Sequence, residues 1–142
     1  MILPGNDIDN ALPGFDEPTL RRLMGQFFVH SFNAIIITSA DSGFPIVYAN
    51  PAFCRMTGYS ADELIGQSPR IFQGEKTNPK VLQRLKADLE AGRDFHGATI
   101  NYRKNGEPYP VEWNISRVLD GNGSASHYIS IQKDLSHLKQ VM

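Results

Sequence analysis

The chain has 142 residues, 41% of them hydrophobic and 20% charged, which is the size and composition of one globular domain with a single core. Its net charge of -1 argues against a nucleic-acid-binding surface that neutralises phosphates, and no apolar run approaches the roughly 20 residues that span a bilayer. One cysteine, Cys54, cannot form an internal disulfide, and the N-terminus lacks the pattern of a secretory signal. We therefore expect a cytoplasmic protein with neither nucleic acid nor membrane as a partner.

The N-terminal part of the chain predicts an arm followed by one helix. Residues 1–16 are rich in proline and glycine, which is typical of a flexible arm. A helix is expected over residues 17–30, with Asp16 as its N-cap and Pro18 in its first turn. Its apolar side chains recur at helical spacing and predict a buried face that leaves room for a dimer contact: Leu20, Leu23, Met24, Phe27 and Phe28.

The rest of the chain predicts five strands and several helices. In order, we expect strands over residues 34–39 and 45–49, short helical segments over 50–66, a longer helix over 78–91, and strands over 95–103, 108–119 and 126–132. Asn105-Gly106 predicts a two-residue hairpin turn, and Pro110, inside a strand, predicts a bulge or an edge position. This order predicts an α+β fold, with a five-stranded antiparallel sheet and the short helices on one face.

Two adjoining runs resemble a known family. The segment from Asn50 to Gly66 is similar to the N-x-x-F…TGY…E-x-x-G run of PAS domains, and residues 66–74 resemble the GxNCRFLQG signature of LOV domains, the flavin-binding blue-light branch of that family. In LOV domains the cysteine forms a light-induced bond to the flavin. Here that position is Pro69, and the asparagine before it is Ser68. Because proline has no nucleophile, the resemblance implies a flavin pocket without adduct chemistry.

The resemblance also implies which residues hold the cofactor. LOV pockets bind the polar edge of the flavin with side-chain amides, each of which combines a donor and an acceptor. Two of these amides match Asn101 and Gln132, whereas the third falls on Val111 and is lost. The family's phosphate-binding positions match Arg70, Gln73 and Lys86. Without a ligand, the two amides would satisfy backbone groups of the strands, and the two cations would be solvated surface charges.

Alternation along the strand over residues 108–119 adds an argument that does not depend on the family. Val111, Trp113 and Ile115 share one face, and that face must point into the cavity. Packing is the minimum role of Trp113. Its indole could also stack near a flavin and donate an electron to it on excitation.

Other chemistries are disfavoured by what the sequence lacks. The helix over residues 78–91 contains no histidine that could serve as an axial haem ligand, and the four histidines of the chain lack metal-ligand spacing. There is no nucleophile elbow and no phosphate-binding glycine loop, so we expect neither a metal site nor an enzyme.

The C-terminal segment, residues 133–138, resembles the D-I-T-type ending of PAS domains, from which a signalling helix emerges. The chain is thus expected to contain a flexible arm (1–16), an N-terminal cap helix (17–30), a PAS/LOV-like sensor domain (31–136) and the start of an output helix (137–142).

The sequence favours a sensor that binds FMN or FAD without a covalent bond and responds to light or redox state. Reduction would turn the flavin N5 atom from acceptor to donor, and Gln132 would reorient its amide and shift the last strand and the output helix. We expect a homodimer with an attached or separate effector. The alternative is a PAS module without a cofactor, or for a small metabolite, that mediates dimerisation in a signalling or transcription regulator. Val111 in place of an amide favours this alternative.

Overall fold

The computed structural model describes residues 14–141, and the side chains of 139–141 are not described. The first thirteen residues of the expected arm therefore lie outside the described residues. Along the chain, the elements are α2 (Glu17–His30), β1 (Ala34–Ser39), β2 (Ile46–Ala49), α3 (Pro51–Thr57), α4 (Ala61–Leu64), the 3-10 turn η2 (Pro69–Phe72), α5 (Pro79–Glu90), β3 (Phe95–Tyr102), β4 (Pro108–Leu119), β5 (Ala125–Asp134) and α6 (Ser136–Val141).

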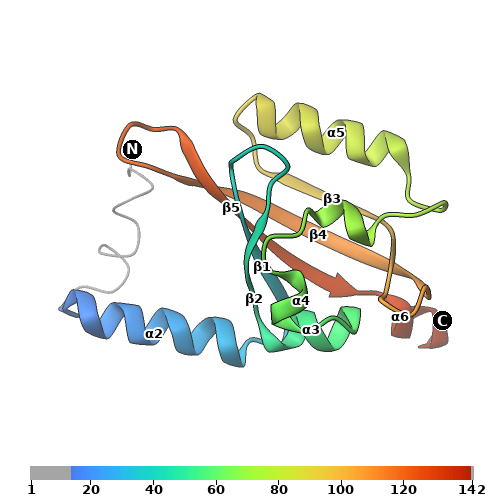
Figure 1. Ribbon diagram of the computed structural model, residues 1–142, viewed down its shortest axis with the longest axis horizontal. Coiled ribbons are helices and arrows are strands. Elements are labelled where there is room, and N and C mark those ends of the chain that lie inside the picture. The colour runs from blue at the N-terminus through green and yellow to red at the C-terminus, as the bar shows by residue number, and fades with distance from the viewer. Residues whose placement is uncertain (1–13, 142) are drawn as a thin grey trace.

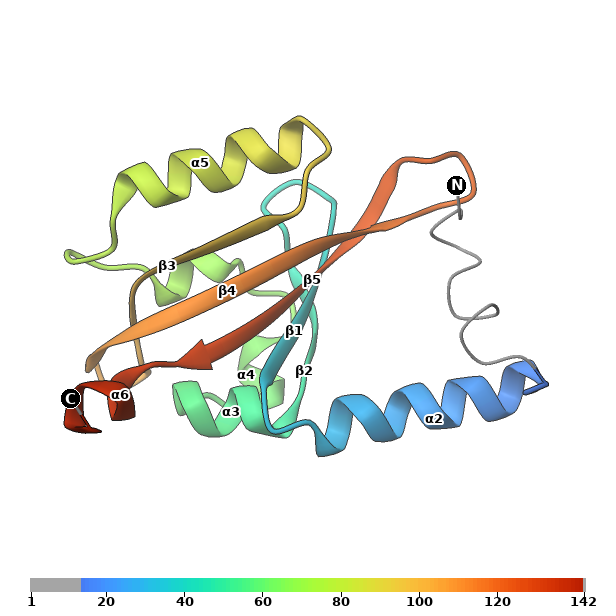
Figure 2. The same ribbon diagram turned by 180° about the vertical axis from the view of Figure 1, so that it is seen from behind.

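The five strands form one antiparallel sheet in the order β2-β1-β5-β4-β3. The short helices α3 and α4 and the longer α5 lie on the same face of this sheet (Figure 1), and the opposite view shows β1 in front of α4 (Figure 2). Helix α2 projects past the edge of the sheet in both views. The predicted α+β fold is confirmed.

Asn50 shows how one buried polar residue can fix several elements. Its side chain is fully buried and caps α3, because Oδ1 accepts from the backbone N–H of Phe53 at 3.0 Å. The same oxygen accepts from the N–H of Ile35 at 2.9 Å, while Nδ2 donates to the carbonyls of Phe28 and Asn33. All the polar atoms of this amide are satisfied, so a single residue joins the end of α2, β1 and α3.

The turn between β3 and β4 differs from the prediction. The N–H of Arg103 donates to the carbonyl of Glu107, and the N–H of Gly106 donates to the carbonyl of Arg103, both at 2.9 Å, so three residues form the loop instead of two. A two-residue type I′ turn needs positive φ at both central residues. Only Gly106 has it, at 88°, because Asn105 instead uses its side-chain oxygen to accept from the N–H of Glu107.

The prediction for Pro110 is wrong about a bulge, because the β3–β4 register is regular there, but Pro110 has no partner in β5 and so lies at a local edge of the ladder. It pairs in regular register with Ile100, on a strand that has neighbours on both sides. Its carbonyl accepts from the N–H of Leu135 at 2.9 Å, one residue beyond the end of β5. The N–H and C=O of one residue point toward the same neighbouring strand. The donor that proline lacks would therefore face the place where β5 has already ended.

The buried apolar side chains form two separate clusters under the helices. The first joins β1 and β2 to α3, α4 and η2: Ala34, Ile36, Ile46, Ala49, Phe53, Leu64 and Phe72. The second lies on β3 and β4, with α5 packed against it: Phe95, Tyr109, Val111 and Trp113. The half-buried side chain of Met56 packs against both. The polar groups of interest lie where these two clusters approach each other.

Candidate cofactor site

Asn101 and Gln132 are buried on the face of the sheet that the helices cover, with 3% and 6% of their surfaces exposed. Their strands, β3 and β5, flank β4 and do not pair with each other. Gln132 is paired across the strands with Ala34 of the first cluster on one side and with Trp113 of the second cluster on the other. The register therefore places the glutamine at the division between the two apolar clusters.

Among residues 14–141, five buried side-chain polar atoms have no hydrogen-bond partner within the protein. Two are acceptors, Oδ1 of Asn101 and Oε1 of Gln132, and two are donor groups, the hydroxyl of Tyr109 and Nε1 of Trp113. The fifth, Nε of Arg117, lies further along β4. An unsatisfied buried polar group costs about 1–3 kcal/mol. Four of these atoms lie on the three adjacent strands β3, β4 and β5, where water or a ligand that carries both donors and acceptors would satisfy them.

The polar edge of a flavin has this chemistry, since it presents an N–H between two carbonyls. The two amide oxygens and the two donor groups on the chain are complementary to such an edge in kind, and the surrounding side chains are apolar. Val111, at the position of the missing amide, is fully buried and provides only apolar contact. The residues present therefore fit a flavin.

The amide of Gln132 is half satisfied within its own strand. Its Nε2 donates to Oγ of Ser130 at 3.0 Å, and both residues are buried. This bond leaves Oε1 as the free end of the amide.

Tyr109 is a candidate site residue that the sequence reasoning missed. It lies directly across from Asn101 in the β3–β4 pairing and is almost fully buried. Burial raises the pKa of its phenol, and the Asp134 carboxylate raises it further. The Arg103 guanidinium and a contact with the Asn101 amide offset this only in part, so the hydroxyl remains a neutral donor. The alternation that placed Val111 and Trp113 inward extends two residues back to Tyr109 and could have identified it.

The expected phosphate-binding residues lie on or beside the helices and not on the strands that carry the amides. Arg70 lies in η2, Gln73 follows it, and Lys86 lies on α5; all three are exposed. Among the ion pairs of the described residues, none includes Arg70 or Lys86. Ser68 caps η2, with Oγ accepting from the N–H of Arg70 at 3.3 Å, so the LOV-like segment begins a helical turn at Pro69.

The single cysteine does not replace the missing nucleophile. Cys54 lies on α3, is half-buried and packs against the first apolar cluster. Burial raises the pKa of its thiol, which disfavours the thiolate. Within residues 14–141, no three histidine, cysteine or acidic side chains are grouped to hold a metal ion.

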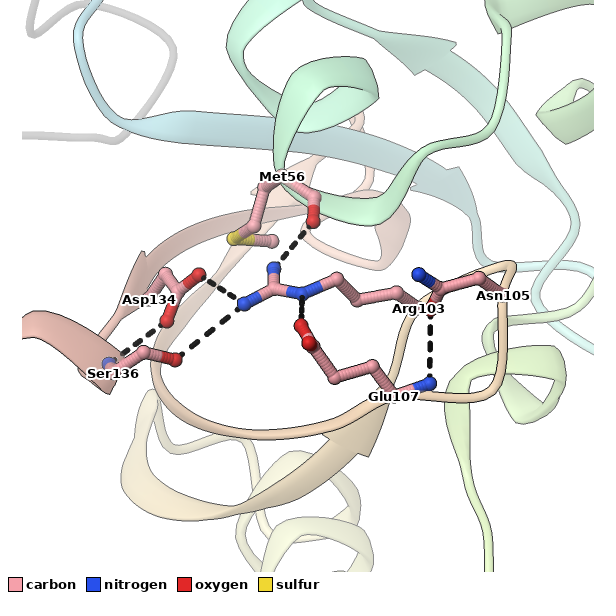
Figure 3. A network of polar contacts seen from close by, with 6 residues as sticks. All are labelled: Met56, Arg103, Asn105, Glu107, Asp134 and Ser136. Carbon is pink, nitrogen blue, oxygen red and sulfur yellow. Dashed lines mark hydrogen bonds and ion pairs between the residues drawn. The ribbon is translucent and has the colours of Figure 1, made fainter.

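A network around Arg103 joins the site to the start of α6 (Figure 3). The guanidinium lies over the ring of Tyr109, with its carbon 4.2 Å from the ring centre. It donates to the carbonyl of Met56 at 2.6 Å and to the carboxylate of Asp134 at 2.8 Å. Asp134 in turn accepts from the N–H of Ser136, the first residue of α6, at 2.9 Å. One side chain thus contacts α3, β4, the end of β5 and the residues that begin the last helix.

An open groove of about 600 Å³ lies elsewhere, between α2 and β1. Apolar side chains from both elements line it, including Phe27, Phe32 and Ile35. It does not include any of the amide or aromatic residues of the candidate site. No helix of the described residues has the length and apolar character needed to cross a membrane.

Comparison with known proteins relates the chain to sensory regulators. A family model described as a PAS domain matches residues 33–137. The chain is 36% identical over 131 residues to the nitrogen fixation regulatory protein of Klebsiella oxytoca, which covers 91% of this chain and 26% of that protein. It is 40% identical over 92 residues to the blue-light-activated histidine kinase of Brucella canis, covering 65% of this chain and 19% of the kinase. The chain therefore spans about a quarter or less of the length of these relatives.

Solved structures give the same relationship. An RNA-binding light-oxygen-voltage receptor superposes with a TM-score of 0.82 at 28% identity, over 92% of this chain and 39% of the receptor chain. The LOV domain of the Erythrobacter litoralis EL346 blue-light-activated histidine kinase superposes with a TM-score of 0.69 at 28% identity, over 73% of this chain and 96% of the LOV domain. The predicted LOV-like fold is confirmed, and the chain belongs to the PAS domain family, as a sensory domain related to blue-light photoreceptors and nitrogen fixation regulators.

Proposed function

We propose that this PAS domain binds FMN or FAD without a covalent bond and passes a light or redox signal through β5 to α6. The single observation that carries the proposal is the group of four unpartnered buried polar atoms, on Asn101, Tyr109, Trp113 and Gln132. A bound flavin supplies absorption of blue light and reversible reduction. Pro69 at the cysteine position excludes thiol adduct formation.

Each site residue has a definite part in this proposal. Asn101 and Gln132 hold the polar edge of the ring by their amides, and Val111 packs against it. Trp113 lies beside Gln132 in the sheet register. Its indole stacks near the flavin and donates an electron to it on excitation. Arg70, Gln73 and Lys86, exposed on the helical side, bind the phosphate end, while Ser68 keeps η2 in place for Arg70.

Signal transmission follows the chain from Gln132 to the output helix. Asp134 lies two residues after Gln132 and is held by Arg103, which also contacts the ring of Tyr109. A change in the hydrogen bond of Gln132 would therefore act on a strand end whose position is fixed by the same network that holds the start of α6. The effector is a further domain or a separate signalling protein, as in the regulators and kinases to which the chain is similar.

The apolar surface of α2 supports a homodimer within the same proposal. The predicted burial of the apolar stripe of α2 is wrong within this chain, since no residue of the helix is buried. Phe27 and Val29 are 64% and 46% exposed, and Phe32, just after the helix, is fully exposed. Burying such a surface against a second copy would remove it from water.

The decisive experiment is the flavin titration of the purified protein. Apoprotein incubated with FMN or FAD should give a yellow complex with structured blue absorption, and the double variant Asn101→Leu/Gln132→Leu should lose it. Ser116→Ala is a matched control, because Ser116 is exposed on the opposite face of β4. A wild-type protein that folds but takes up neither flavin would contradict the proposal.

One observation favours the cofactor-free alternative, a PAS module that acts in dimerisation. Val111 is fully buried within the second apolar cluster, at the position where the family has a third amide. In that case, the α2 surface would be the functional part of the chain, and sizing would show a dimer in protein that carries no flavin.

A further inference from the structure

Ser130 is buried on β5 two residues before Gln132, so both side chains lie on the same face of the strand. Its Oγ accepts from Nε2 of Gln132 at 3.0 Å, the contact that determines which end of the amide stays free. The cross-strand neighbours of Ser130 are Ile36 on β1 and Ile115 on β4, both apolar. In the sheet register, neither neighbour of Ser130 could take over this contact.

A serine hydroxyl differs from the amide in one important respect, because it can both donate and accept. In the observed orientation, the hydroxyl oxygen of Ser130 accepts from Nε2, and Oε1 of Gln132 faces the site. After a half-turn of the amide, Oε1 would accept from the same hydroxyl, and Nε2 would face the site. Either orientation therefore leaves one end of the amide bonded to Ser130 and the other end available.

We propose that Ser130 is a positioning residue that stabilises both orientations of the Gln132 amide, so that the bound ligand atom alone selects between them. The role rests on the proposed flavin function. When the ring atom is a donor, Gln132 presents Oε1 to it, and when the ring atom is an acceptor, Gln132 presents Nε2. In both orientations the other end of the amide is bonded to Ser130, so neither end is left without a partner. Removing the hydroxyl, as in Ser130→Ala, would leave one end of the amide unpaired in both orientations.

The test is a double-mutant cycle on flavin affinity, measured for the oxidised and the reduced cofactor. Ser130→Ala should weaken binding of both forms by about five- to twentyfold, because an amide that is held in neither orientation makes a weaker hydrogen bond to the ring. Ser130→Thr, which keeps a hydroxyl, should recover most of the affinity. In a Gln132→Leu background, Ser130→Ala should change the affinity by less than about twofold, because there is no amide left to position.

The outcomes separate this role from simple packing. An equal loss from Ser130→Ala with and without Gln132 would mean that Ser130 acts on the fold and would overturn the proposal. So would an unchanged affinity and an unchanged position of the flavin absorption bands in Ser130→Ala. Ser116→Ala, on the exposed face, serves as the control for the loss of a strand hydroxyl. If the wild-type chain itself binds no flavin, the proposed function fails, and this role fails with it.

Discussion

Replacement of Arg103 by glutamine should destabilise the domain and loosen its last helix. The Arg103 side chain is only 20% exposed and connects parts of the chain that are distant in sequence. It donates to the carbonyl of Met56 at 2.6 Å, to Asp134 at 2.8 Å and to Glu107 at 2.5 Å. Glutamine has a shorter side chain with one amide donor group, so it can replace one of these bonds at most.

The expected loss can be estimated contact by contact. Glu107 is 58% exposed, so its ion pair contributes little. The bonds to Met56 and Asp134 are partly buried, and a hydrogen bond to a charged group contributes about 1.5–3 kcal/mol. Allowing for one replaced bond and for the lost contact with the Tyr109 ring, we expect a decrease of about 2–4 kcal/mol in the free energy of unfolding.

Urea denaturation measures this free energy, and amide hydrogen exchange locates the change. The matched control is Arg21→Gln, because Arg21 pairs with Glu17 at 2.6 Å while both side chains are 75% exposed. We expect the control to lose less than about 0.5 kcal/mol. Faster exchange in Arg103→Gln should be concentrated in α6 and the end of β5. Equal stability of the two variants would refute the reasoning.

The same network should make the effect of Arg103→Gln depend on pH. Burial acts to raise the pKa of Asp134, but hydrogen bonds from Ser136 and the ion pair with Arg103 outweigh it and hold the pKa below its ordinary value of 3.8. A carboxyl with a lowered folded-state pKa contributes stability that is present above 3.8 and is lost as the pH falls through the folded-state value. The stability difference between wild type and variant should therefore be constant near neutral pH and shrink below pH 3.8. A stability difference between wild type and Arg103→Gln that stays constant down to acid unfolding would contradict this role of the Asp134–Arg103 pair.

Three further predictions concern the site and the α2 surface. Tyr109→Phe should weaken flavin binding by about three- to tenfold without loss of stability, whereas Tyr48→Phe, beside Phe28 of α2, should change neither. Trp113 is the sole tryptophan of the chain, so flavin binding should strongly quench the protein's tryptophan fluorescence; an unchanged emission would place the flavin elsewhere. Phe32→Ser should shift the protein from dimer toward monomer in sizing at micromolar concentration while the monomer stays folded, and an unchanged size would exclude this surface as the interface.

Helix boundaries could be predicted well because capping is local chemistry. Asp16 accepts from the N–H of Thr19, and Asn78 accepts from that of Lys80, so the sequence around each cap determines where α2 and α5 begin. The last strand was predicted too short at both ends, over residues 126–132 instead of Ala125–Asp134. Its final residues pair with β4, up to Asp134 opposite Val111. Pairing of this kind depends on a strand elsewhere in the chain and has no local signal.

The residues of the candidate site also differ in whether a local sequence signal could identify them. Family resemblance indicated Asn101 and Gln132, and strand alternation indicated Trp113, because these depend on a motif or a period within one strand. Ser130 was not identified, since its importance arises only from its contact with the amide of Gln132. The Arg103 network was missed for a related reason. Its partners, Met56 and Asp134, are 47 and 31 positions away in sequence and meet only in the folded domain.

The unpartnered polar groups of the site favour a neutral ring as the ligand over a charged metabolite. The four unpartnered polar groups are two amide oxygens, an indole N–H and a phenol that burial keeps neutral. A carboxylate ligand would need a cation, and Arg103, which lies over the Tyr109 ring, is already bonded to Asp134 and Glu107. An ammonium ligand would leave both aromatic donors without an acceptor. A ligand with neutral donors and acceptors side by side, as on the edge of a flavin, can pair with these groups without adding a buried unpaired charge: its N–H can donate to an amide oxygen, and its carbonyls can accept from the aromatic donors.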